Sequence, residues 1–192
     1  GLYGVEKNSV HHITILRRSI DARRSPIKIN LRVALYQKGE KVHEERFSPR
    51  NYDKKDRQKK VVIIGFGPAG MFAALRCIEL GLQPIVLERG KDVQARRRDL
   101  KSINRDNIVG EDSNYCFGEG GAGTYSDGKL YTRVKNKKAV RRVLEILVQH
   151  GATSEILVEA HPHIGTNRLP GVVKNIRESI INAGGEIYFE TK

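Results

Sequence analysis

The sequence predicts an α/β protein in which a parallel sheet is preceded by a small α+β segment. A continuous apolar run at residues 61–64 (VVII) is followed by a glycine-rich turn and then by helical apolar spacing at 71–80. A second apolar run follows at 84–87 (PIVL). Buried strands of a parallel sheet have this uniformly apolar pattern. Strand, turn, helix and strand in this order make up a βαβ unit.

The rest of the chain continues the alternation of helices and strands. Residues 139–148 and 172–183 have amphipathic helical spacing, and we expect residues 91–107 to be helical in part. We expect residues 186–190 (EIYFE) to form a third parallel strand beside the first two. Residues 110–128 are rich in glycine and are not expected to be regular throughout.

The front segment has a different character and predicts a separate domain. Residues 9–16 and 27–36 have the pattern of strands, and residues 17–26 (RRSIDARRSP) predict a turn or a short helix between them. Residues 47–60 show no apolar periodicity and predict a charged linker. We therefore divide the chain into a small basic α+β domain, residues 1–56, and a second domain, residues 57–192.

Charge is concentrated in this front segment. The 192 residues carry a net charge of +13, and residues 1–60 hold 16 Lys and Arg against 7 Asp and Glu. Such asymmetry can mark a nucleic-acid or membrane-surface partner. A solvated basic face is the simpler interpretation, and we expect no nucleic-acid partner.

Composition gives expectations about location and completeness. No run of 18 or more apolar residues occurs, so no transmembrane helix is expected, and the first residues do not resemble a signal peptide. The two cysteines, Cys77 and Cys116, form no CxxC pair, which favours a reducing cytoplasm. The single methionine is Met71, within the chain, so we expect an N-terminally cut fragment.

The turn at residues 65–70 carries the strongest functional signal. It is Gly-Phe-Gly-Pro-Ala-Gly, and G-x-G-x-x-G between a strand and a helix is the fingerprint of a dinucleotide-binding Rossmann unit. Gly65 permits the tight turn, Gly67 lets a pyrophosphate approach the backbone, and Gly70 lets the helix pack closely on the sheet. The alternative is a glycine turn in another kind of α/β protein. The cofactor-binding residues expected here are Gly65, Gly67, Pro68, Ala69 and Gly70.

A carboxylate ends the second predicted strand. Glu88 follows Gly70 by 18 residues, where an acidic side chain accepts hydrogen bonds from ribose hydroxyls. The same charge would repel a 2′-phosphate, so we expect no NADP at this site. The ending Glu88-Arg89-Gly90 is usual in flavin sites, and we include Arg89 among the cofactor-binding residues.

A second glycine-rich stretch, residues 117–130 (FGEGGAGTYSDGKL), favours FAD over NAD. It offers several backbone N–H groups and close approach to a ligand, and a simple nicotinamide domain has no need of it. The alternative is a surface loop without a ligand. The further cofactor-binding residues expected in this loop are Gly120, Gly121, Ala122, Gly123, Thr124, Ser126 and Lys129.

These motifs together resemble a bacterial family of FAD-dependent dehydrogenases within the glutathione-reductase-like class of flavoproteins. The resemblance rests on VVIIGFGPAGMFAAL, VLERG, FGEGGAGTYSDGKL and PHIGTNRLPGVVKNIR and covers about residues 10–192. It implies a two-domain FAD fold with the first glycine turn and Glu88 on the ADP half and residues 120–129 toward the pyrophosphate and flavin. Members of the family are much longer, which implies that substrate-binding and flavin-closing parts lie outside this chain.

Three further features receive a structural interpretation. His161 and His163 have no acidic or cysteine partner nearby, so no metal is expected. We expect Cys116 to be buried rather than redox-active. Arg96, Arg97 and Arg98 could reach a phosphate, but a solvated helix face is the simpler interpretation.

The sequence thus predicts a cytoplasmic FAD-dependent oxidoreductase with an unknown substrate, and no catalytic residue can be named. An NAD(P)H donor would bind outside this chain. Two alternatives belong to other classes: an RNA-modifying flavoenzyme or nucleic-acid-binding module that uses the basic front segment, and a non-catalytic dinucleotide sensor.

Overall fold

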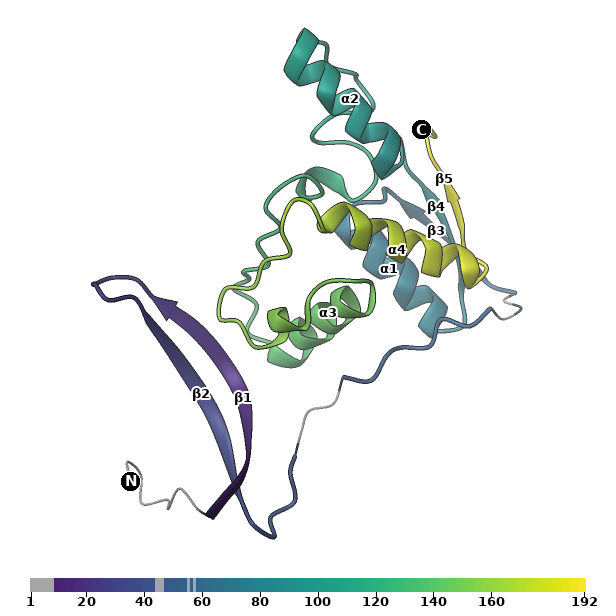
Figure 1. Ribbon diagram of the computed structural model, residues 1–192. Coiled ribbons are helices and arrows are strands. Elements are labelled where there is room, and N and C mark those ends of the chain that lie inside the picture. Colours follow the sequence, from purple (N-terminus) through teal and green to yellow (C-terminus); the bar gives the residue numbers. More distant parts are fainter. Residues whose placement is uncertain (1–8, 44–46, 55, 57) are drawn as a thin grey trace.

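The computed structural model describes residues 9–43, 47–54, 56 and 58–192, and it is a mixed α/β structure (Figure 1). The front segment is an antiparallel hairpin of β1 (Val10–Asp21) and β2 (Lys28–Gln37) that projects from the rest of the molecule. Its described residues contain no α-helix, and only Ser9 lies in a 3₁₀ turn, so the helical part of the α+β expectation for residues 1–56 is not found in the part that the structure describes. The expected turn or short helix at 17–26 is strand up to Asp21, followed by a turn.

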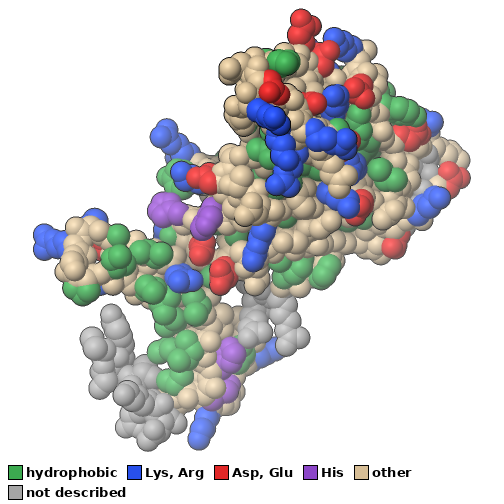
Figure 2. Space-filling model, turned by 45° about the horizontal axis from the view of Figure 1, so that its top comes forward, with side chains coloured by type: hydrophobic (Ala, Val, Ile, Leu, Met, Phe, Trp, Pro, Cys, Tyr) green, Lys and Arg blue, Asp and Glu red, His purple; other side chains and the backbone are tan. Residues whose placement is uncertain are grey.

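Two backbone hydrogen bonds connect the hairpin to the body. The Arg18 N–H donates to the Val158 carbonyl at 2.8 Å, and the Ala160 N–H donates to the Arg18 carbonyl at 2.8 Å. One face of the hairpin carries apolar side chains that remain 38–65% exposed. Figure 2 shows hydrophobic side chains along this projecting arm. The apolar side chains of this face are those of Ile13, Ile15, Ile20, Ile29, Leu31, Val33 and Leu35.

The body contains a parallel three-stranded sheet in the order β3 (Lys60–Ile64), β4 (Gln83–Leu87) and β5 (Glu186–Tyr188). The pairing of β4 with both neighbours is parallel, with Ile63 opposite Val86 and Val86 opposite Ile187. The predicted third parallel strand beside the two apolar runs is therefore confirmed.

Four helices accompany this sheet: α1 (Pro68–Glu79), α2 (Val93–Asp106), α3 (Lys137–Gln149) and α4 (Leu169–Asn182). Two short 3₁₀ turns, η2 (Gly121–Gly123) and η3 (Ser154–Leu157), lie in the connections. All four helices fall in segments predicted as helical. Helix α1 begins three residues before the expected position because Pro68 suits the first turn, where a backbone N–H has no partner within the helix.

The core lies on one face of the parallel sheet. Helices α1 and α4 pack there against Ile63, Val86 and Ile187, and Figure 1 shows both helices on the same side. The other face is open: Val62 is 59% exposed and Ile64 is 79% exposed. Parallel sheets usually have both faces covered, so this sheet presents an apolar face to the surroundings.

The segment between hairpin and sheet lies along the helices. The Arg50 backbone exchanges two hydrogen bonds with the Gln149 side chain, at 2.9 and 2.8 Å. The Tyr52 ring lies 5.9 Å from that of His150. Among the residues that the structure describes, no helix has the length and apolar character needed to cross a membrane.

Candidate functional site

The turn between β3 and α1 uses its three motif glycines in three different ways. Gly65 has a φ of +90°, a conformation that side chains rarely adopt. A Cβ on Gly70 would lie 2.0 Å from the Gly65 carbonyl oxygen, so α1 approaches the turn as closely as only glycine permits. Gly67 has a φ of −74°, and a Cβ there would meet only the Gly121 Cα, at 3.9 Å. The fold itself therefore requires Gly65 and Gly70 but not Gly67.

Helix α1 begins at this turn without a side-chain cap. Its N-cap is Gly67, Pro68 occupies the first turn, and no acidic residue lies there. Asp92 caps α2 and Asn136 caps α3 through their side chains, whereas α4, like α1, has no side-chain cap. The first N–H groups of a helix have no partner within it and carry a partial positive charge. The start of α1 is thus suited to an anion.

Glu88 lies at the end of β4 and is 5% exposed. Its Oε2 accepts the Phe66 N–H at 2.6 Å, and its Oε1 accepts the N–H groups of Gly90 at 2.8 Å and Gly118 at 3.2 Å. The carboxylate thus joins the first glycine turn, the end of β4 and the second glycine loop. A carboxylate offers about four acceptor positions, so capacity for a further donor remains.

The second glycine loop packs directly on the first. The Gly120 N–H donates to the Phe66 carbonyl at 2.8 Å. Gly118, Gly120 and Gly121 all have positive φ, and a Cβ on Gly120 would lie 2.0 Å from the Thr124 Oγ1. These glycines are required by close packing and backbone conformation. The sequence predicted an association of both loops with one ligand, and the structure brings them into contact.

Arg96 of α2 holds this second loop in place through hydrogen bonds. Its side chain is fully buried, and its guanidinium donates to the carbonyls of Asn114 at 3.0 Å, Tyr115 at 3.0 Å and Glu119 at 2.7 Å. Burial lowers the pKa of Arg96, and this is partly offset by Tyr125 and Glu88. The solvated face expected for residues 96–98 is therefore wrong for Arg96. It holds for Arg97 and Arg98, which are exposed.

Glu119 is a second buried charge that the sequence interpretation missed. It is fully buried, accepts the Val93 N–H at 2.6 Å and lies 3.0 Å from the Arg177 Nη1. Burial raises its pKa, which the Val93 N–H and Arg177 oppose. Glu119 thereby fixes the loop to the start of α2 and to α4.

The two loops, the ends of β3 and β4 and residues 191–192 line an open cavity of about 440 Å³. Glu88 lies in its lining, and the Arg89 guanidinium lies 4.2 Å from the centre of the Phe117 ring. Cavities of this size are typical of small-molecule sites. The expected site residues that line it are Gly65, Gly67, Glu88, Arg89 and Gly121.

Other expected site residues lie outside this lining. The Thr124 hydroxyl donates to the Glu119 carbonyl at 3.0 Å, and the Ser126 hydroxyl donates to the Gly123 carbonyl at 2.7 Å. Lys129 is exposed and pairs with Asp127 at 3.0 Å. Ala122 and Gly123 belong to η2. In this structure these residues shape the loop and its continuation.

Cys116 is exposed and lines the cavity, so its expected burial is wrong. The reason is local: the Asn114 side chain accepts the N–H groups of Cys116 and Phe117 and turns this segment outward. His161 and His163, for which no metal was expected, lie in the connection before α4. The His161 ring lies 5.6 Å from that of Tyr131, and the backbone of His163 pairs with that of Lys129 in an isolated antiparallel β-bridge.

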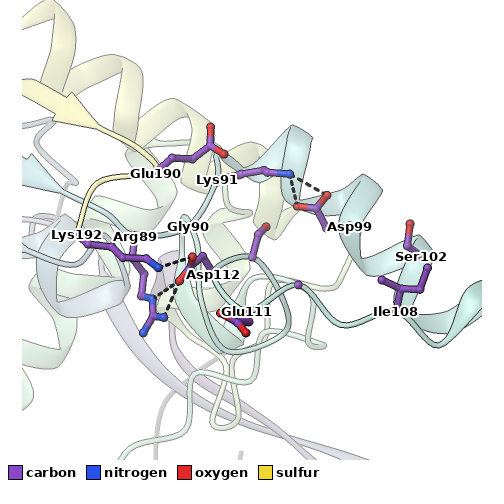
Figure 3. Close-up of a pocket in the computed structure, with 12 residues that line it drawn as sticks. Arg89, Gly90, Lys91, Asp99, Ser102, Ile108, Glu111, Asp112, Glu190 and Lys192 are labelled. Atoms are coloured by element: carbon purple, nitrogen blue, oxygen red, sulfur yellow. Dashed lines mark hydrogen bonds and ion pairs between the residues drawn. The ribbon is translucent and has the colours of Figure 1, made fainter.

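A second hollow of about 390 Å³ adjoins the first, and Figure 3 shows its lining. Arg89 and Lys192 belong to the lining of both. Asp112 lies between these two cations, with its Oδ1 2.6 Å from the Arg89 Nη2 and its Oδ2 2.7 Å from the Lys192 Nζ.

Taken together, fold and site define a mixed α/β chain with a strand–glycine turn–helix unit and an anion-compatible cavity at its end. In comparisons with known proteins, residues 2–36 match a domain of unknown function, DUF8436. The chain is also 41% identical over 202 aligned positions to a Clostridium beijerinckii protein described as uncharacterized. The match covers 98% of this chain and 38% of that relative, so the chain spans well under half of the relative's length.

Proposed function

We propose that the chain forms the ADP-binding part of an FAD-dependent oxidoreductase, with a Rossmann-like unit made of β3, α1, β4 and β5. The observation that carries this proposal is Gly67. The fold gives Gly67 neither a positive φ nor a close neighbour, yet it lines the cavity at the start of an uncapped helix. A pyrophosphate in the cavity would explain why a side chain is absent there.

Glu88 and the second loop support FAD as the dinucleotide. Glu88 faces the same cavity and has acceptor capacity left for ribose hydroxyls. The second loop extends the site beyond the first turn, as a ligand longer than ADP requires. A bound flavin would supply electron or hydride transfer, while this chain's residues bind and orient its ADP end. We also propose a cytoplasmic location, in keeping with the free cysteines Cys77 and Cys116.

The test replaces Gly67 with valine and measures FAD binding by quenching of flavin fluorescence. We expect Gly67→Val to weaken FAD binding at least about tenfold, since its side chain would enter the pyrophosphate position.

Gly171→Val is the matched control. Gly171 is also a glycine without positive φ and with open space around an added Cβ, but it lies on α4 outside the cavity lining. FAD affinity equal in the two folded variants, or tight NAD binding without flavin binding, would contradict the proposal.

A second candidate function is nucleic-acid binding by the hairpin. Arg17 and Arg32 lie opposite each other across the strands, and like charges in this position repel unless an anion lies between them. Binding to RNA that is tight at about 0.15 M salt and falls steeply with added salt would favour this function. We expect weak or no binding, because no aromatic side chain alternates with these arginines.

A non-catalytic sensor would bind FAD without turnover of an electron acceptor.

A further inference from the structure

The cavity that Glu88 lines carries two cations that both pair with one carboxylate. Arg89 directly follows Glu88, and Lys192 belongs to the same cavity lining and lies beside Arg89 in Figure 3. The Arg89 Nε and Nη2 lie 3.1 and 2.6 Å from the Asp112 Oδ1. The Lys192 Nζ lies 2.7 Å from the Asp112 Oδ2. Asp112 thus engages both cations, one with each of its oxygens.

These ion pairs add little to the free energy of unfolding. The side chains of Asp112, Arg89 and Lys192 are 36%, 43% and 65% exposed, and exposed ion pairs add little to stability. Lys192 first and Arg89 second hold the pKa of Asp112 below its usual range, so the carboxylate is charged at neutral pH. The ion pairs therefore matter mainly for the charge presented to a ligand.

Without Asp112, the same two side chains would form an anion site. A guanidinium beside a lysine is a favourable partner for a phosphate, because the arginine fork binds two oxygens at once. Both cations line the cavity that Glu88 lines, where the proposed function places the ribose. Asp112 occupies the guanidinium donors that a 2′-phosphate would need.

We propose that Asp112 is a specificity-determining residue that excludes a 2′-phosphorylated dinucleotide from this site. This inference rests on the proposed function, because it takes the adenosine position from it. Glu88 repels a 2′-phosphate directly, and Asp112 withholds the cations that would offset this repulsion. The site therefore selects ligands with a free ribose 2′-hydroxyl, such as FAD, against the NADP class.

The experiment compares ADP with its 2′-phosphorylated analogue, 2′-phosphoadenosine 5′-diphosphate, by titration calorimetry. We expect the wild-type chain to prefer ADP. We expect Asp112→Asn to shift the affinity ratio toward the 2′-phosphorylated ligand by about threefold or more at low salt, with a smaller shift at about 0.5 M salt.

Glu111→Gln is the matched control, because it removes one negative charge from the same loop and the same hollow at a residue that, unlike Asp112, forms no ion pair with Arg89 or Lys192 in the described structure. Adding Arg89→Gln to Asp112→Asn should abolish the gain. Equal ratios for wild type and Asp112→Asn, or an equal shift for Glu111→Gln, would overturn the inference while ADP binding still supported the proposed function. Failure of the folded wild-type chain to bind either ligand or FAD would overturn both.

Discussion

Arg96 shows how one buried side chain can position a functional loop. Its guanidinium bonds to three carbonyls of residues 114–119, and these residues include part of the cavity lining. Its flat, forked geometry suits several acceptors at once. The loop therefore depends on α2 for its shape, although α2 contributes little to the main core.

We expect Arg96→Met to lower the free energy of unfolding by about 3 kcal/mol or more, because several carbonyls lose their donors inside the protein. Arg96→Lys should restore only part of this loss, since a single ammonium cannot reach three carbonyls equally well. Urea denaturation measures the effect.

The neighbouring substitution Arg97→Met is the control, because Arg97 is exposed. It should change the free energy of unfolding by no more than about 0.5 kcal/mol. Similar losses for both substitutions would show that helix α2, and not the Arg96 hydrogen bonds, is the sensitive feature.

Residue spacing predicted the glycines of the first turn but not Arg96. The roles of Gly65 and Gly70 follow from a motif whose backbone geometry is tightly constrained, and the structure has that geometry. Arg96 lies in a run of three arginines, which suggested a solvated face. Its spacing from Val93 and Leu100, both buried, is the helical spacing of one face. That periodicity was the available signal for its burial.

At the scale of elements, His150 joins three segments. It ends α3, its Nε2 lies 3.0 Å from the Ser179 Oγ of α4, and its ring lies beside Tyr52 of the segment before the sheet. Its Nδ1 lies 2.7 Å from the Ile146 carbonyl, an acceptor, so the proton of the neutral ring is on Nδ1. Burial lowers the pKa of His150 below its ordinary 6.5.

This lowered pKa predicts a pH dependence of stability. Below about pH 6.5 the unfolded chain binds a proton at this histidine while the folded chain does not, so the free energy of unfolding falls as the pH decreases. The fall is complete once the pH is below the folded pKa. We expect the urea midpoint to drop between about pH 7.5 and pH 5.5, and His150→Gln to reduce that drop.

His161→Gln is the control, because His161 is exposed. It should leave the difference between the two pH values as in wild type. If His150→Gln also leaves the difference unchanged, the titration of other groups governs the pH dependence.

The sequence predicted the regular elements of the body better than those of the front segment. Uniform apolar runs and helical spacing are strong signals, and they identified β3, β4 and all four helices with small errors at the ends. The hairpin was harder, because two arginines and one serine interrupt the apolar pattern of residues 17–20 while their backbone still pairs with β2. Cross-strand pairing of this kind is not visible in local composition.

At the scale of the whole molecule, two apolar surfaces lack a partner among the described residues. One is the hairpin face that includes Ile20 and Ile29, and the other is the sheet face with Val62 and Ile64. Apolar side chains that stay exposed to water contribute little to the stability of a chain, because the hydrophobic contribution requires burial. The glycine-rich second loop adds a cost, because fixing each residue of a flexible backbone costs about 1–2 kcal/mol.

These surfaces predict that the 192-residue chain is marginally stable and binds FAD weakly. A ligand raises stability by RT ln(1 + [L]/Kd), which is only about 0.4 kcal/mol when its concentration equals Kd. For a chain of this size, 1 kcal/mol corresponds to about 2–4 °C in Tm. We therefore expect excess FAD, at about 0.1 mM, to raise Tm by less than about 2 °C in a thermal melt followed by circular dichroism. We also expect no turnover of an electron acceptor. A sharp cooperative transition that FAD raises by about 5 °C or more would contradict this prediction, because the cavity between the two glycine loops would then suffice for tight binding.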